Sequence, residues 1–347
     1  MGDPVELEHH LTIGGVAYDL LWLEAREALD EMSVLRCELS DRAGGPDPAA
    51  LLGKPLVLSL SSHGGAQQRK LAGYVVEAES TTTRGDEETG TRVVARPHLF
   101  RLGQRADCRV FQDMPAPDIV KKVLEGAGIA SEGQRWQISG SYPKRVYTTQ
   151  YRETDLDFIH RLLAEEGIAF AVDSSSGADV VVFFDGDLGD IAGDKAIPHR
   201  PGDGLNAPHD AIGALTHQKA TAPGAVNLRD YDFERPRLKL DSRAEGDDAA
   251  EKSLEVYHYP GRFSEPAEGD RYAKVLLDSL RARREVVSGH TNTLRLHPGC
   301  KFQLEDHPYA PLNQEYLVLA VDITLEARRN VQRRRDAAGR GQRLTFQ

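Results

Sequence analysis

Two aspartates, Asp185 and Asp187, have the spacing of the first two ligands in a calcium-binding loop. Such a loop needs glycine at its sixth position, for a sharp turn, and glutamate at its twelfth, which binds the ion through both oxygens. This sequence has Asp190 and Ala196 at those positions, and its glycine stands at the fifth. An acidic surface turn is therefore favoured over a calcium site.

Three histidines and a pair of glutamates are further candidates. His290, His297 and His307 lie in one neighbourhood and could supply the nitrogen ligands of a zinc site. The chain has 12 histidines in all, so a chance grouping is the favoured interpretation. Glu165 and Glu166 could work as an acid and a base, but adjacent helical positions point to different faces, which argues against a joint role.

Single reactive side chains are weaker candidates. Cys108 precedes Arg109, whose charge could lower the pKa of the thiol. A buried, inert thiol is the commoner case, and we expect it here. His160 follows the apolar Ile159 on an expected helix, so we expect a packed or surface histidine rather than a general base.

The sequence lacks the motifs of three common enzyme classes. A nucleophile elbow requires Gly-x-Ser-x-Gly, which residues 140–142 (GSY) do not supply. A phosphate loop ends in Gly-Lys-Ser or Gly-Lys-Thr, whereas residues 53–55 (GKP) place a proline where the helix should begin. No zinc helix of the His-Glu-x-x-His type is present. We therefore predict no catalytic, cofactor-binding or metal-binding residue, no cofactor, and a protein that is not an enzyme.

The composition is that of a soluble protein with more than one domain. The 347 residues suggest about two or three domains. Their 43 basic and 54 acidic side chains give a net charge of −11, which argues against a general nucleic-acid binder. No apolar run approaches the ~18 residues of a membrane span, the acidic N-terminus is unlike a signal peptide, and three scattered cysteines cannot form a disulfide framework. We expect a cytoplasmic protein without a membrane span.

The first hundred residues indicate strands with no helix between them. Short apolar segments are separated by breakers such as residues 44–48 (GGPDP), which is typical of a barrel or sandwich. Two helices are expected next, one opening at Pro117 and one capped by Thr154. The buried face of the second helix should consist of Phe158, Ile159, Leu162 and Leu163.

The second half of the chain indicates further strands, joined by two long connections. Residues 185–213 and 234–252 are expected as exposed loops. A third helix is expected over residues 269–287. Its inward residues would be Tyr272, Leu276, Leu277 and Leu280. Seven arginines occur between residues 328 and 343, and because no aromatic residues interleave with them, a solvated linker is favoured over a nucleic-acid-binding arm.

Eight short phrases carry a resemblance to a known family. In chain order they are residues 105–112 (RADCRVFQ), 117–120 (PDIV), 140–143 (GSYP), 151–168 (YRETDLDFIHRLLAEEGI), 223–224 (PG), 228–233 (LRDYDF), 257–261 (YHYPG) and 313–318 (NQEYLV). Together they resemble the hub region of valine-glycine-repeat (VgrG) spike proteins of type VI secretion systems, which is similar to the baseplate hubs of contractile phage tails. The resemblance covers residues 5–327 and is most specific in the stretch 151–168. The matched positions look like determinants of folding and packing, so no catalytic residue is carried over.

The resemblance implies a mainly β fold with α+β insertions, as in phage tail hubs. It implies two similar β-barrel domains and a mixed α/β portion. On this basis the chain divides into a first β-barrel (1–106), a mixed α/β portion (107–213), a second β-barrel that includes the helix 269–287 (214–327), and a basic tail that leads toward a missing or separate spike domain (328–347).

The resemblance also implies a structural role and a set of partners. Three chains would form a homotrimeric ring, since a head-to-tail contact closes when its rotation is one third of a full turn. Six similar barrels would then meet a hexameric tube of haemolysin-coregulated protein (Hcp), and the ring would join that tube to a three-fold spike. A spike domain or tip protein and an effector or adaptor are further implied partners, and nucleic acid is not. Such a protein would be cytoplasmic before firing and then delivered outside the cell or into a target cell.

Several alternatives stay open. The chain stops where family members continue into a further barrel and a β-helical needle, so either the sequence is a shortened one or the hub is a separate polypeptide that pairs with its own spike. The hub could belong to a contractile phage or phage-like tail. A glycan- or cargo-binding module that uses the loop around residues 201–204 is less favoured. So is a cell-wall hydrolase that uses the acidic loops 185–210 and 241–251.

Overall fold

A computed structural model describes residues 7–41, 46–62, 65–82, 89–201, 209–326 and 343–346. Strands in the first half of the chain are β1 (Glu8–Ile13), β2 (Val16–Tyr18), β3 (Leu20–Ala28), β4 (Val34–Asp41), β5 (Pro55–Ser62), β6 (Gln67–Thr82), β7 (Thr89–Arg96), β8 (Ala106–Met114), β9 (Gln134–Gln137), β10 (Arg145–Thr154), β11 (Ala169–Asp173) and β12 (Val180–Phe184). Those that follow are β13 (Ala196–Pro198), β14 (Ile212–Lys219), β15 (Ala225–Asp230), β16 (Leu240–Glu245), β17 (Glu255–His258), β18 (Glu285–Thr291), β19 (Lys301–Glu305), β20 (Glu315–Leu317), β21 (Ala320–Glu326) and β22 (Arg343–Phe346). The helices are α1 (Pro48–Leu51), α2 (Ala116–Gly126), α3 (Asp155–Glu166) and α4 (Pro266–Arg281), with 3-10 helices η2 (His98–Gln104), η3 (Ser131–Gly133) and η4 (Ala310–Leu312). In these ranges, no helix combines the length and the apolar character that crossing a bilayer requires.

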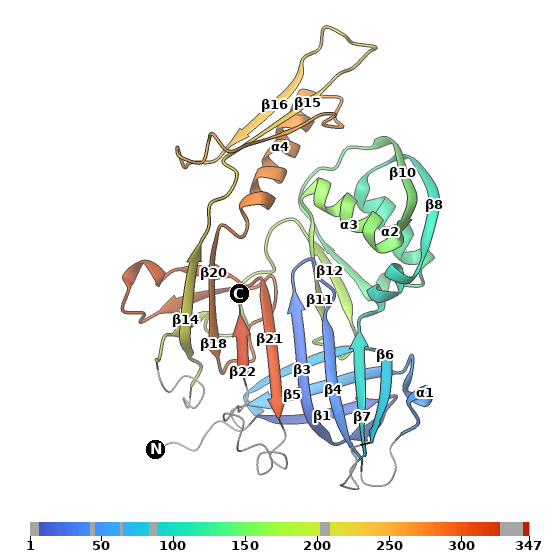
Figure 1. The fold of residues 1–347 in the computed structure, drawn as a ribbon, viewed down its shortest axis with the longest axis vertical. Coiled ribbons are helices and arrows are strands. Elements are labelled where there is room, and N and C mark those ends of the chain that lie inside the picture. The colour runs from blue at the N-terminus through green and yellow to red at the C-terminus, as the bar shows by residue number, and fades with distance from the viewer. Residues whose placement is uncertain are drawn as a thin grey trace.

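Eleven strands form one large sheet in the order β14-β18-β22-β21-β3-β4-β7-β6-β5-β1-β2 (Figure 1). We call β1–β7 the first lobe, and β13, β14 and β18–β22 the second lobe. The lobes are joined where β21 pairs antiparallel with β3, which places Ile323 opposite Ala25. Across this junction Arg26 donates to Asp322, with Nη1 3.1 Å from each carboxylate oxygen. The pairing therefore connects parts of the chain that lie 296 positions apart.

One hydrophobic core contains side chains of both lobes. On β5, Leu56, Leu58 and Leu60 are buried at every second position, as expected for a strand that covers a core. Phe302 and Leu304 of β19 join the same core from the second lobe. The expected mainly β fold with α+β insertions is confirmed. Within the described residues, the two β regions share one open sheet and one core rather than closing into separate barrels.

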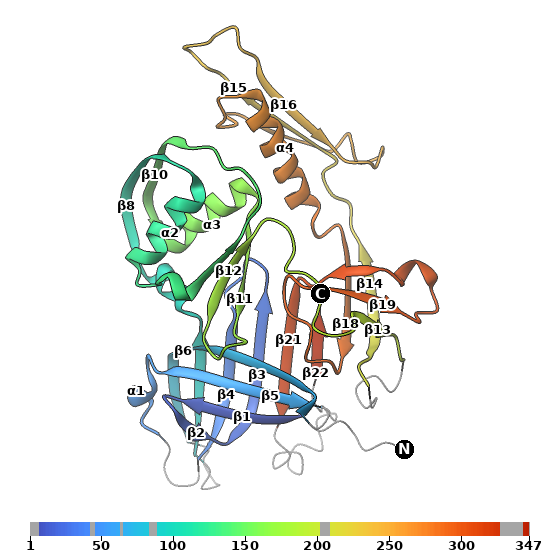
Figure 2. The same cartoon turned by 180° about the vertical axis from the view of Figure 1, so that it is seen from behind.

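The sheet turns a corner in the middle of β6, so that β5 and β1 cross β3 and β4 (Figure 2). Residues 67–74 of β6 pair with β5, and residues 74–82 pair with β7. Gly73 lies at the changeover, where an added Cβ would be 2.8 Å from the carbonyl oxygen of Arg96. Since no side chain fits at that distance, the corner requires glycine.

The two helices expected in the middle of the chain are confirmed as α2 and α3. Thr154 caps α3, because its hydroxyl accepts a hydrogen bond from the backbone N–H of Asp157 at 3.0 Å. Gly167 ends the helix with a φ of +71°. The expected buried face is also confirmed, and it belongs to a second core: Phe158, Ile159, Leu162 and Leu163. The helices pack on one face of a two-stranded ribbon, β8 with β10, and a separate sheet has the order β11-β12-β9.

The third helix, expected over residues 269–287, begins and ends earlier. It is α4, residues 266–281, and the residues from Glu285 onward belong to strand β18. Pro266 suits the first turn of a helix, where a backbone N–H has no partner within the helix. Val286 and Val287 are β-branched and pair with β14 in the large sheet, which is why the helix does not extend to them.

Helix α4 covers one face of a small sheet, β16-β15-β17, which we call the distal sheet. Val226 and Leu228 of β15 pack there against Leu277 in a third core. Tyr272 and Leu276, also expected to face inward, are half-buried. Leu280, the remaining residue expected to face inward, is 37% exposed and does not join that core.

The connection over residues 185–213 is not the exposed loop that was expected. Ile191 and Ile197 are buried in the main core, and β13 pairs in parallel with β19. The apolar side chains of this segment fill the second lobe, so the expectation is wrong for this part. Residues 202–208 of that loop and residues 328–342 of the expected basic tail lie outside the described residues, while residues 343–346 pair with β18 and β21.

We expect Leu162→Ala to lower the free energy of unfolding by about 2–5 kcal/mol, because a fully buried side chain would leave a cavity. Leu280→Ala is the matched control, since it makes the same truncation on a helix at an exposed position. It should change the free energy of unfolding by less than about 1 kcal/mol. Denaturant unfolding of both variants measures the difference, and equal losses would contradict the burial described here.

Candidate interaction surfaces

The carboxylate of Asp185 holds a turn of the chain. It accepts hydrogen bonds from the backbone N–H groups of Ser139 (2.8 Å) and Gly140 (2.6 Å) and from the Tyr142 hydroxyl (2.8 Å). Burial alone would raise the pKa of Asp185, but these hydrogen bonds lower it. Asp185, one of the two aspartates with calcium-loop spacing, is thus committed to anchoring residues 139–142.

Asp187 and the three C-terminal histidines have separate surroundings. The Asp187 carboxylate lies 3.3 Å from Lys301 Nζ. His290 lies on β18, and burial lowers the pKa of His297. His307 packs against another histidine ring, with 4.5 Å between the centroids. Within the part of the chain that the structure describes, no three His, Cys, Asp or Glu side chains gather where they could hold a metal ion.

Glu165 and Glu166 meet the same guanidinium group. Arg145 Nη1 is 2.5 Å from Glu165 Oε2, and Arg145 Nη2 is 2.6 Å from Glu166 Oε1. Glu166 is also bound by Arg271 of α4, and its side chain is fully buried. Burial would lower the pKa of Arg145, but its hydrogen bonds to the two glutamates raise it overall. We call these four residues the α3–α4 ion cluster, and it ties the mixed portion to the distal part of the chain.

No motif in the sequence marks Asp155, the second fully buried carboxylate of α3. It is bound by Arg109 of β8 and accepts a hydrogen bond from Gln150 Nε2 of β10 at 2.9 Å. Arg105 Nε lies 3.6 Å from its other oxygen. The phrases at 105–112 and 151–168 hold both arginines and the aspartate, so they encode the docking of α3 onto the ribbon.

His160 is packed on α3. Its ring centroid lies 5.2 Å from that of Phe170, and burial lowers its pKa. Its surroundings are therefore those of a packed residue.

Cys108 is exposed, so the expectation of a buried thiol is wrong. Successive residues of a strand face opposite sides, and the neighbouring Arg109 points to the helices. Cys108 therefore points to solvent. Cys37 and Cys300 are buried, and burial raises their pKa to about 12 and about 11.

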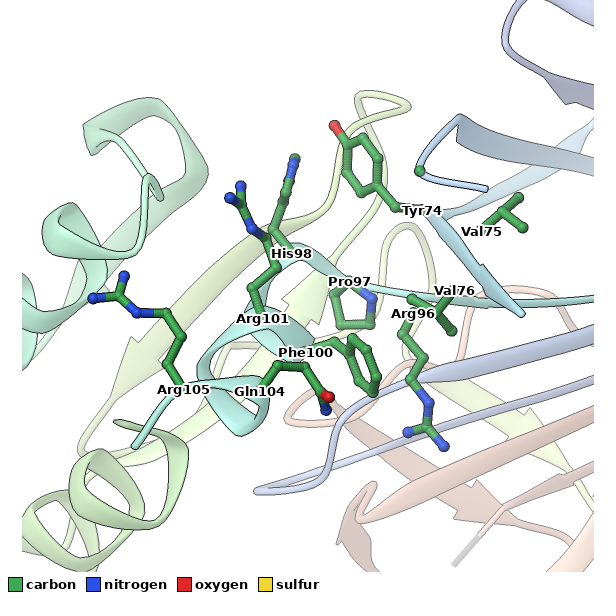
Figure 3. A pocket seen from close by; sticks show the side chains of 11 residues that line it. Tyr74, Val75, Val76, Arg96, Pro97, His98, Phe100, Arg101, Gln104 and Arg105 are labelled. Carbon is green, nitrogen blue, oxygen red and sulfur yellow. The ribbon is translucent and has the colours of Figure 1, made fainter. Parts of the chain in front are cut away.

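A cavity of about 540 Å³ lies between η2 and β6 (Figure 3). On its wall His98 packs against Tyr74, with 3.7 Å between ring centroids. The cationic side chains Arg96, Arg101 and Arg105 point in different directions (Figure 3). Since an anion is held by cationic groups that converge on it, the cavity does not form an anion site.

The face of the ribbon that points away from the helices is uncovered. Its members are Cys108, Val110 and Gln112 of β8 and Tyr147, Thr149 and Tyr151 of β10. We call these six residues the ribbon face. All six are exposed, and Tyr147 and Tyr151 are exposed by 60% and 64%. The sequence did not lead us to expect this surface. Its sign in the sequence is that two segments carry uncharged residues at every second position.

Comparisons with known proteins found one family model and several relatives. The model for the phage tail baseplate hub (GPD) matches residues 26–329. The type VI secretion system spike protein VgrG4b of Pseudomonas aeruginosa is 33% identical over 326 residues, which is 92% of this chain and 40% of that protein. The chain thus spans about two fifths of the length of this curated relative.

Two solved structures have the same fold. One is the Escherichia coli c3393 protein, described as a component of the type VI secretion system that is similar to the T4 tail proteins gp27 and gp5. It has a TM-score of 0.69 and 19% identity over 97% of this chain and 75% of that one. The other is the 43 kDa tail protein of prophage MuSo2 from Shewanella oneidensis. It has a TM-score of 0.69 and 13% identity over 98% of this chain and 97% of that one.

We expect Glu166→Ala to lower the free energy of unfolding by about 3 kcal/mol, because it leaves Arg145 and Arg271 without their shared buried partner. Glu165→Ala removes a neighbouring carboxylate that is 29% exposed, and it should cost less than about 1 kcal/mol. Chemical denaturation measures both losses. An equal cost for the two variants would show that the ion cluster does not hold α3 to α4.

Proposed function

This chain belongs to the phage tail baseplate hub family, and on that premise we propose that it is the hub of a type VI secretion spike. Three copies close into a ring that adapts a hexameric tube to a three-fold spike. The role is structural, since the ring supplies matching surfaces and a rigid connection. Catalysis is not part of it.

The observation that carries the proposal is the pairing of β21 with β3. It fixes two β lobes side by side in each copy, on one shared core. Three copies therefore offer six lobes, and a tube end that repeats six times can meet one lobe per tube subunit. A head-to-tail contact between copies closes such a ring without leaving free ends.

The upper part of each copy supports the same arrangement. The mixed portion lies above the first lobe, and α4 with the distal sheet lies above the second (Figures 1 and 2). The α3–α4 ion cluster connects these two upper parts, as the β21–β3 pairing connects the lobes. Each copy is thus held together by two long-range contacts, one between the lobes and one between the upper parts. The resulting rigidity suits a part that transmits force along the axis of a tube.

The partners follow from this role. A hexameric tube of an Hcp-like protein meets the lobes, a spike domain or tip protein meets the other side of the ring, and an effector or adaptor can be carried with them. We favour a type VI spike over a phage-tail hub because VgrG4b is 33% identical, whereas the prophage tail protein is 13% identical. Such a hub resides in the cytoplasm before firing and leaves the cell with the apparatus.

We expect native mass spectrometry to find three copies per particle, because a ring with two lobes per copy needs three copies to match six tube subunits. The measurement uses the protein as the cell makes it, together with any spike domain attached to it. Addition of an Hcp-like tube protein should then increase the particle mass by whole hexamers.

The control is a tube protein from an unrelated tail, which should leave the mass of the trimer unchanged. Monomers at every concentration, both alone and with the tube protein, would contradict the proposed function.

A further inference from the structure

The six side chains of the ribbon face carry no charge, and the charged group that lies against them is the guanidinium of Arg152, 5.2 Å from the centroid of the Tyr151 ring. Its six members alternate along β8 and β10 with residues that point to α2 and α3. On the covered side, Phe111 stacks on Phe158 and Gln150 binds Asp155. The uncharged character is therefore a property of the outward side, where contact with water would favour charged residues.

The distal sheet provides an internal comparison, since it is also a small sheet with a helix on one face. Its outward face is crossed by ion pairs. Arg243 lies 3.0 Å from Glu255 and 3.2 Å from Glu245, and Arg229 lies 3.9 Å from Asp241. The same chain thus places ion pairs across one such surface, whereas the six outward side chains of the other are uncharged. Depletion of charge together with tyrosine is the composition found at the centre of protein interfaces.

The position of the ribbon shows which neighbour can reach it. The ribbon lies at the lateral edge of the molecule, with α2 and α3 between it and α4 (Figures 1 and 2). The opposite side of the mixed portion is taken by the chain's own α4, through the α3–α4 ion cluster. In a head-to-tail ring each copy meets one neighbour on either side. The side that carries the ribbon face is the one left for the next copy.

We infer that the ribbon face is a contact surface between neighbouring copies of this chain in the ring. The inference rests on the proposed function and identifies the surface that the ring uses. Tyr147 and Tyr151 would be its anchors, because each offers a large, stiff, exposed side chain, one at either end of the patch. Among the described residues, β8 and β10 pair with no further strand, although Arg161 of α3 donates to the backbone carbonyl of Thr149 at 3.2 Å.

The test is Tyr151→Lys in the full chain, with Tyr257→Lys as the matched control. Both tyrosines are exposed on strands of small, helix-backed sheets, but Tyr257 belongs to the charged distal sheet. For Tyr151→Lys, sedimentation velocity over a range of concentrations should show a dissociation constant of the trimer that is about 30-fold or more above that of the wild type. Tyr257→Lys should match the wild type. Thermal unfolding followed by circular dichroism checks that both variants are folded.

A second measurement uses the wild-type protein and does not depend on how a variant folds. Cys108 is the exposed thiol of the ribbon face, and the buried Cys37 and Cys300 give the background rate. Maleimide labelling of Cys108 should be at least about tenfold slower in the trimer than in dilute monomer, because an interface excludes the reagent.

The outcomes separate this inference from the proposed function. A wild-type trimer whose Cys108 reacts at the monomer rate, or a folded Tyr151→Lys variant that still forms trimers as well as wild type, would overturn the inference and leave the ring standing. A wild-type protein that never trimerises would overturn the ring and this inference together.

Discussion

The pairing of β21 with β3 is the constraint on which the rest of the structure depends. It brings a strand near the end of the described chain back beside one near its beginning, so the segments between them that lie outside the large sheet must leave that sheet and return to it. The mixed portion and the distal sheet are two such excursions, and both rise on the same side of the lobes (Figure 1). Because the excursions touch, the ion cluster around Glu166 can lock them to each other. One long-range strand pair and one buried cluster thereby make the lobes and their upper parts a single frame.

Three acidic residues help to build this frame. Asp185 holds a turn, Asp155 fixes the start of α3 on the ribbon, and Glu166 fastens the end of α3 to α4. A buried carboxylate bound by arginines is costly to disturb, and it cannot also serve as a free acid or base. These carboxylates thus hold elements of the fold together, which agrees with membership of the hub family.

Local features of the fold could be predicted from the sequence, and non-local ones could not. The cap at Thr154 and the buried stripe with Leu162 follow from spacing within one helix, and both are confirmed. The end of α4 was predicted too late in the chain. Val286 and Val287 pair with β14, about 70 positions away, and local sequence does not show such a partner. Cys108 was expected to be buried because a buried thiol is the commoner case. That general tendency does not indicate which face of a particular strand is exposed to solvent. Resemblance to the hub family predicted the fold class, while the shared sheet depends on contacts between residues 296 positions apart.

The rotational symmetry of the assembled particle, seen by cryo-electron microscopy, tests the central claim most directly. The account predicts a three-fold ring in which first and second lobes alternate around the axis, so that six lobes face one end. It also predicts that the sheet continues through each copy across the β21–β3 junction. A map of separate subunits, or a closed ring in which the lobes do not alternate, would contradict the account.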